Sequence, residues 1–120
     1  MSIESRLALL AASPSTALLK YIVRGIEKEC LRVGSNGQLA FTSHPKALGS
    51  ALTHPSITTD YSEALLEFIT APSTSIDEVL QELHEIHRYT YQHIDDELLW
   101  VSSMPCQLGT DDSIPVGQYG

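Results

Sequence analysis

Apolar residues recur at helical spacing in two short stretches at the start of the chain. In residues 3–11 and 15–22 they stand three or four positions apart, and Ser13-Pro14-Ser15 separates the two stretches. This spacing places apolar side chains on one face of a helix, and proline is a frequent first residue of a helix. The pattern therefore predicts two short helices before residue 23.

The spacing changes to strand-like alternation between residues 23 and 33. The sequence Gly34-Ser35-Asn36-Gly37 follows, and Asn-Gly is typical of a turn between antiparallel strands. We expect residues 38–42 to form the returning strand. Residues 43–58 contain two His-Pro dipeptides and a glycine, and predict an irregular connection with at most a short helical piece. Such a connection in a compact domain favours a functional role.

The second half of the chain predicts a buried strand and a long helix. Residues 65–70 form a mostly apolar run with Glu67 inside it, and Ala71-Pro72 ends the run. Ser75 and Glu78 have the spacing of a capping box, and an apolar series follows at helical steps as far as residue 98. After residue 100 the pattern returns to strand or loop, with a polar turn at residues 109–113. One domain, or one piece of a domain, accounts for these elements.

Composition limits the classes of partner. The chain has 120 residues and a net charge of −8, so it lacks the clustered Lys and Arg of a nucleic-acid groove or of a protein that binds anionic membranes. Acidic chains more often bind cations, or phosphates through bridging metal ions. Two cysteines without CxxC spacing make no disulfide framework, so we expect reduced thiols in a cytoplasmic protein.

No apolar run approaches the roughly 20 residues that cross a bilayer, and we expect a soluble protein. Residues 7–12 are apolar, but the residues before them lack the positive charge of a signal peptide. We interpret this segment as part of an amphipathic helix.

Glu27 and Glu29 are the most unusual feature of the first predicted strand. Residues i and i+2 of a strand point to the same face, so the two carboxylates project side by side together with Leu31 and Val33. Two like charges on a partly buried face are costly unless a cation lies between them. The alternative is a solvated edge strand whose charges face water, and the pattern alone leaves both interpretations open.

Two more carboxylates favour a metal site. Glu67 lies within an apolar run that offers it no polar face, and Asp60 lies just upstream. Mg²⁺ prefers oxygen ligands and often shares them with substrate phosphates. Four carboxylates on adjacent strands are therefore expected to hold a metal-bound nucleotide.

Other candidate residues give weaker indications of a functional site. His84 and His87 lack the H-E-x-x-H spacing of a zinc helix, and the two His-Pro dipeptides are expected to form turns. Cys30 alternates away from Glu29 and is expected to pack as a small hydrophobic residue. The sequence contains neither of the glycine-rich phosphate-binding motifs G-x-x-x-x-G-K-[ST] and G-x-G-x-x-G. Binding of a nucleotide would therefore depend on metal ions.

Seven sequence blocks closely resemble, in order and spacing, the amino-terminal part of proteobacterial glutamate–cysteine ligase, also called γ-glutamylcysteine synthetase. The resemblance runs from about residue 20 to the end of the chain. The blocks are Arg24-Gly25-Ile26-Glu27-Lys28-Glu29, Gly49-Ser50-Ala51-Leu52-Thr53-His54, Ile57-Thr58-Thr59-Asp60-Tyr61, Glu63-Ala64-Leu65-Leu66-Glu67-Phe68-Ile69-Thr70, His87-Arg88-Tyr89-Thr90, Ser103-Met104-Pro105-Cys106 and Gln118-Tyr119-Gly120.

The resemblance implies both a fold and a reaction. The fold is α+β, part of a curved antiparallel sheet similar to that of glutamine synthetase, with packing helices. The reaction is ATP- and Mg²⁺-dependent ligation of the γ-carboxylate of L-glutamate to the amino group of L-cysteine through an acyl phosphate, the first step of glutathione synthesis; Mn²⁺ is a possible substitute for Mg²⁺.

The resemblance also assigns roles to individual residues. Glu27, Glu29, Asp60 and Glu67 fall on metal-ligand positions, and Tyr61, where relatives often carry Phe, falls near the pocket for the cysteine substrate. It assigns no catalytic residue in this chain.

Members of this family are several times longer than 120 residues. We therefore expect residues 1–120 to be the amino-terminal fragment of a single catalytic domain, inactive by itself. Two alternatives stay open, namely a related ligase that uses another amine and a non-catalytic acidic metal-binding domain.

Overall fold

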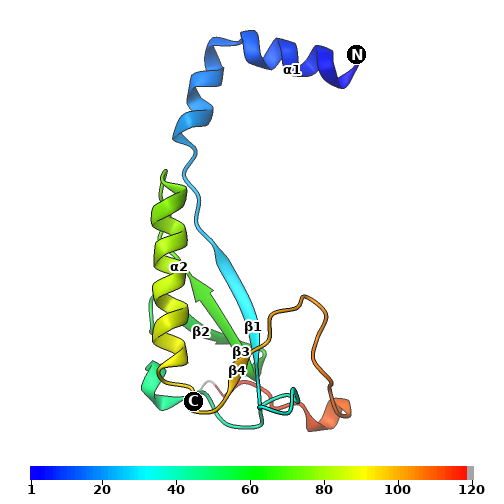
Figure 1. Cartoon of the computed structure of the whole chain (residues 1–120), viewed down its shortest axis with the longest axis vertical. Coiled ribbons are helices and arrows are strands. Elements are labelled where there is room, and N and C mark those ends of the chain that lie inside the picture. The colour runs from blue at the N-terminus through cyan, green and yellow to red at the C-terminus, as the bar shows by residue number, and fades with distance from the viewer. Residues whose placement is uncertain (119–120) are drawn as a thin grey trace.

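Four antiparallel strands form the sheet on which the body of the molecule is built (Figure 1). The computed structural model describes residues 1–118, so Tyr119 and Gly120 of the last sequence block lie outside the described residues. The strands are β1 (Glu27–Val33), β2 (Ile57–Asp60), β3 (Ser62–Ile69) and β4 (Leu98–Leu99), and they lie in the order β2-β3-β1-β4. The sheet and the helices make a mixed α+β fold.

The central pair, β1 and β3, sets the register of the sheet. Glu27 lies opposite Ile69 and Leu31 lies opposite Leu65, with the intervening residues paired in order. Each strand alternates its side chains between two faces, so this register also decides which residues share a face.

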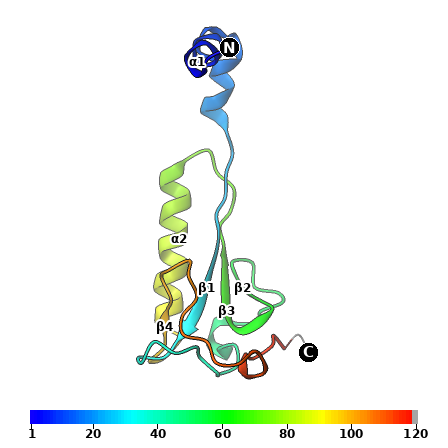
Figure 2. The same cartoon turned by 90° about the vertical axis from the view of Figure 1, so that its right-hand side faces the viewer.

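One long helix covers one face of the sheet. Helix α2 (Ile76–Tyr91) begins at Ser75, whose hydroxyl accepts a hydrogen bond from the backbone N–H of Glu78, and it packs along the strands (Figure 2). The core between helix and sheet contains Phe68 and Leu66, which are fully buried. Its other buried members are Cys30, Leu48, Ile57, Ile86, Ile94 and Leu99.

A second, smaller core lies near β4 and includes the end of β1. Its buried members are Val33, Leu39, Ala64 and Cys106, and Leu31, Trp100 and Ile114 pack against them. Leu31 and Val33 alternate onto the same face as Glu27 and Glu29. This core therefore covers only one end of that face, and Glu27 and Glu29 stay exposed.

The first 21 residues form an arm that projects away from the body (Figures 1 and 2). It consists of helix α1 (Ile3–Ala12) and the 3-10 helix η1 (Pro14–Tyr21), and neither contains a buried residue. Its base is tied to the body by two backbone hydrogen bonds between Arg24 and Ser73. Within residues 1–118, no helix is long and apolar enough to cross a membrane.

Most of the predicted elements are confirmed, with shifted ends. Both early helices, the buried strand around Glu67 and the Ser75 cap are present. The irregular connection contains only the short 3-10 helix η2 (Lys46–Leu48), and the polar turn contains η3 (Asp111–Ser113). The first strand begins at residue 27 instead of 23.

The predicted returning strand over residues 38–42 is wrong. After the turn Leu39 forms a single bridge with Val33, and the backbone pairing ends where Ala40 donates to the carbonyl of Arg32. The carbonyls of Thr42 and Ser43 then accept hydrogen bonds from the Arg32 guanidinium. The strand that pairs with this end of β1 is β4.

The apolar series beyond residue 91 does not continue the helix. Helix α2 ends at Tyr91, and Asp95 has a positive φ of 51°, a conformation outside any right-handed helix. Ile94 is nevertheless buried in the same core, so the periodicity predicted burial correctly and helix length incorrectly.

Replacing Ser75 by Ala is expected to lower the free energy of unfolding by about 1 kcal/mol, because the N-terminus of a packed helix loses its cap. Ser2→Ala is the matched control, since Ser2 caps α1 in the same way but α1 buries nothing. Its effect on the urea unfolding of the body is expected to be within about 0.5 kcal/mol. Equal effects of the two substitutions would contradict the conclusion that α2, and not α1, is packed in the core.

Candidate functional site

Four carboxylates from three neighbouring strands lie together on the sheet, away from α2. Glu27 and Glu29 come from β1, Glu67 from β3 and Asp60 from the end of β2. Glu29 lies directly opposite Glu67, which in turn lies opposite Thr58 on β2. The four residues are named here the acidic face.

Alternation along β1 explains why the acidic face has no positive neighbour on its own strand. Lys28 lies between the two glutamates in sequence but points to the helix side, where its Nζ is 5.6 Å from the centre of the Phe68 ring. The ion pairs within residues 1–118 are Arg32–Glu97 and, on α2, Arg88–Glu85. Neither pair involves the acidic face.

Burial and mutual repulsion act together on Glu67. Partial burial raises the pKa of the Glu67 carboxyl above its usual value, and the charges of Glu27, Glu29 and Asp60 raise it further. The four carboxylates are therefore close enough to interact electrostatically. A cation bound among them would remove this repulsion.

The exposure of the acidic face differs from the sequence expectation. Glu27 and Glu29 are exposed, so the expectation that they are partly buried is wrong, whereas Asp60 and Glu67 are half-buried. Strand β4 pairs only with Arg32 and Val33, so the part of β1 that carries Glu27 and Glu29 pairs with β3 on one side, as in the alternative of a solvated strand edge. Within residues 1–118, no three His, Cys, Asp or Glu side chains are arranged so that they could hold a metal ion.

Tyr61 forms the tight turn between β2 and β3, next to Asp60. Its φ of 53° is unusual for a residue with a side chain, and its carbonyl accepts a 2.7 Å hydrogen bond from the backbone N–H of Gly117. The residue is 83% exposed. The turn thus presents the aromatic ring to solvent beside one of the four carboxylates.

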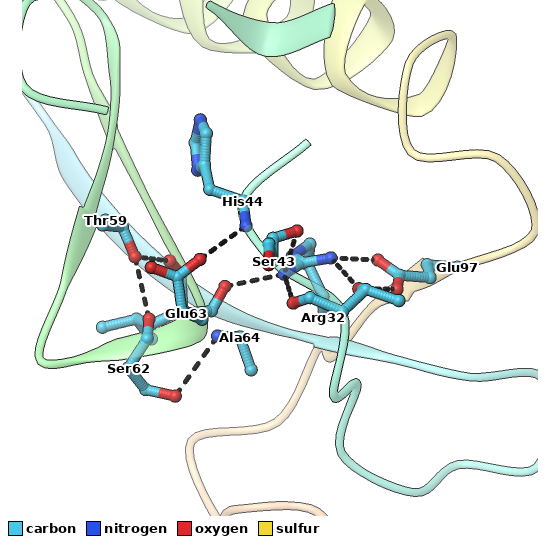
Figure 3. A network of polar contacts seen from close by, with 10 residues as sticks. Arg32, Ser43, His44, Thr59, Ser62, Glu63, Ala64 and Glu97 are labelled. Atoms are coloured by element: carbon cyan, nitrogen blue, oxygen red, sulfur yellow. Dashed lines mark hydrogen bonds and ion pairs between the residues drawn. The ribbon is translucent and has the colours of Figure 1, made fainter. Parts of the chain in front are cut away.

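Glu63 holds this turn in place, a role that the sequence did not reveal. Its buried carboxylate accepts a 2.6 Å hydrogen bond from the backbone N–H of His44 (Figure 3). It accepts another, of 2.5 Å, from the backbone N–H of Gln118, and its own backbone N–H donates to the carbonyl of Pro115. One residue therefore ties the strand that follows Tyr61 to two distant loops.

Arg32 is the second polar anchor that the sequence did not reveal. Its side chain is fully buried, and its guanidinium donates to the carboxylate of Glu97 and to the carbonyl of Glu63 (Figure 3). It also donates to the hydroxyl and the carbonyl of Thr42. The signal in the sequence is an arginine between Leu31 and Val33, on the opposite face of the strand from Glu27 and Glu29.

The remaining candidates have structural roles. The ring of His54 accepts hydrogen bonds from the N–H groups of Ser56 and Ile57, which confirms the predicted turn. His87 forms a hydrogen bond with the carbonyl of Leu83. Cys30 is buried as predicted, and burial raises the pKa of its thiol.

Comparison with known proteins identifies relatives over nearly the whole chain. A family model described as glutamate-cysteine ligase matches residues 7–120. The glutamate–cysteine ligase of Alcanivorax borkumensis is 58% identical over 118 residues, and that of Pseudomonas paraeruginosa is 55% identical over 118 residues. Each match covers 98% of this chain and 22% of the relative. The chain thus spans about a fifth of the length of the curated relatives it matches.

Two solved structures have similar folds. A glutamate–cysteine ligase from Francisella tularensis in complex with AMP is 43% identical, with a TM-score of 0.78 over 82% of this chain and 20% of that chain. A bifunctional glutathione synthetase from Pasteurella multocida is 32% identical, with a TM-score of 0.79 over 96% of this chain and 15% of that chain.

Glu97→Gln is expected to lower the free energy of unfolding by about 3 kcal/mol, because the buried Arg32 guanidinium loses its ionic partner. Glu85→Gln is the matched control. It removes the partner of Arg88 from an exposed pair, and its cost is expected to be about 0–1 kcal/mol. Urea unfolding measures both values, and a similar small cost for the two variants would contradict the role given to Arg32.

Glu67→Gln is expected to stabilise the chain at pH 7 without divalent cations, by on the order of 0.2–1 kcal/mol for a like-charged cross-strand pair. The pKa of Glu67 is raised in the folded state, so ionised Glu67 disfavours folding above that pKa. Below the ordinary glutamate value of 4.5 both states are protonated, and the gain is expected to disappear. Thermal unfolding at neutral and at acidic pH measures the gain in stability. An equal gain at both pH values would contradict repulsion between carboxylates as its cause.

Proposed function

This chain belongs to the glutamate-cysteine ligase family, and we propose that it is the amino-terminal part of an ATP- and Mg²⁺-dependent enzyme that joins the γ-carboxylate of L-glutamate to the amine of L-cysteine. The observation that carries the proposal is the acidic face, where four carboxylates lie on three adjacent strands without an ion pair among the described residues. The enzyme is proposed to act in the cytoplasm, since both cysteines are free thiols.

By the chemistry of its donor atoms the acidic face suits a hard divalent cation, and because no three of the described carboxylates are arranged around one point, the proposal needs further ligands from the remainder of the enzyme. All four side chains offer carboxylate oxygens, which Mg²⁺ and Mn²⁺ prefer, and their mutual repulsion raises the pKa of Glu67. Glu27, Glu29, Asp60 and Glu67 are the residues proposed to hold the ions. When bound, the ions supply positive charge that offsets the charge on the transferred phosphoryl group.

Tyr61 is proposed to contact the cysteine substrate. Its exposed ring stands beside Asp60, and the hydrogen bond from Gly117 fixes the turn that carries it. In the proposed reaction the γ-carboxylate of glutamate takes a phosphoryl group from ATP and ADP leaves. The amine of cysteine then attacks the resulting acyl phosphate, forms the amide and displaces inorganic phosphate. Cys30 and Cys106 are both buried, so neither thiol takes part.

The sheet is proposed to be one portion of a larger sheet of the glutamine synthetase type. Both β2 and β4 are edge strands in residues 1–118, and an open edge favours pairing with further strands. The chain covers 22% of the Alcanivorax relative, so the other parts of the ATP and substrate sites are assigned to the remainder of such an enzyme.

A chimera in which this chain replaces the aligned part of the Alcanivorax borkumensis ligase is expected to form γ-glutamylcysteine from ATP, glutamate and cysteine. Glu27→Gln, Glu29→Gln and Glu67→Gln in the chimera are each expected to raise the Mg²⁺ concentration needed for half-maximal rate by at least about tenfold, because each removes a ligand charge. Product formation at increasing Mg²⁺ concentration measures this effect.

Two controls accompany this measurement. Glu85→Gln lies on α2 and is expected to leave the Mg²⁺ dependence unchanged. The separate 120-residue chain is expected to show no turnover, and turnover by it would refute the assignment of residues to a larger site. Equal Mg²⁺ dependence of all variants would contradict the proposed metal site. A preference of the chimera for another amine would contradict cysteine as the substrate.

A further inference from the structure

The amino-terminal arm exposes far more apolar surface than a short helical segment needs. Leu7, Leu10 and Leu18 are 60%, 49% and 68% exposed. The other exposed large apolar residues of residues 1–23 are Met1, Ile3, Leu9, Leu19, Tyr21, Ile22 and Val23. Isolated exposed leucines are ordinary, but a continuous exposed set of this kind indicates an interaction surface.

The distribution of these residues around α1 narrows the choice of partner. All polar side chains of α1 lie near its start, at Glu4, Ser5 and Arg6, and residues 7–12 are leucine and alanine only. A helix that is apolar on every side is normally buried on every side. A helix that lies on a membrane surface needs a polar face, which residues 7–12 lack, and ten residues are too few to cross a bilayer.

From these observations we infer that the arm is a docking element that inserts its α1 and η1 helices into the carboxyl-terminal remainder of a full-length ligase. The inference rests on the proposal that this chain is part of such an enzyme. The relatives extend far beyond the matched region, which covers only 22% of their length. The remainder therefore has ample surface to enclose the arm.

The match to the solved structure from Pasteurella multocida extends over the arm. The match covers 96% of this chain. Most of residues 3–21 must therefore lie within the matched region. An arm that buries no residue of its own has no local reason to hold one direction. The matched region is 15% of that chain, so most of that protein lies outside it and is available to cover an arm.

Thiol labelling of Leu10→Cys tests the inference directly. The native cysteines are buried, so a cysteine at an exposed position reacts fastest. In the 120-residue chain, Leu10→Cys is expected to react as fast as Ser35→Cys in the exposed turn. In the Alcanivorax chimera, Leu10→Cys is expected to react at least about tenfold more slowly, and Ser35→Cys at an unchanged rate. Mass spectrometry of the peptide that contains the labelled residue gives both rates.

Other outcomes would overturn the inference. Equal labelling of Leu10→Cys in the short chain and the chimera would show that the remainder does not cover the arm. Protection in the short chain that grows with its concentration would indicate a second copy, and protection by anionic phospholipid vesicles would indicate a membrane. Leu18→Cys in η1 repeats the test if Leu10→Cys prevents folding. A folded, protected but inactive chimera would contradict the proposed function alone.

Discussion

The buried guanidinium of Arg32 is the interaction on which the arrangement of the body depends. A charge without solvent access is tolerated only with an ionic partner and further hydrogen bonds. Glu97, Thr42 and the carbonyl of Glu63 provide them, so β1, β3 and two loops meet at one side chain. Because strand side chains alternate, placing Arg32 and Cys30 on one face turns Glu27 and Glu29 toward the other.

This division gives the two faces of the sheet different energetic roles. On the helix side, Phe68, Leu66 and Ile57 are buried almost completely, and their burial provides stability. On the other side, the second core covers only the region around Leu31 and Val33, and the carboxylates beyond it repel one another. The acidic face therefore lowers the stability of the fold that presents it, a pattern that is common at functional sites.

Local patterns predicted the elements well, and contacts between distant residues account for what they missed. The i, i+2 spacing placed Glu27 and Glu29 on one face, and the spacing of Ser75 and Glu78 located the start of α2. The pairing of Glu29 with Glu67 depends on register, which a single strand does not encode. The missing returning strand also reflects a distant contact, because Arg32 binds the carbonyl of Thr42, at the end of the predicted strand, and that of Ser43 just after it.

The arm and the acidic face both lack stabilising contacts within this chain, and they lack different kinds of contact. The body packs its buried apolar groups into two cores and pairs the buried guanidinium of Arg32 with Glu97. The arm exposes apolar residues that water disfavours, and the acidic face presents charges that disfavour one another. An apolar surface is stabilised by further protein and a carboxylate cluster by a cation, so the two features need different partners. The two cores and the buried ion pair of the body involve neither α1 nor the four carboxylates, so the contacts that hold the body together are separate from both features.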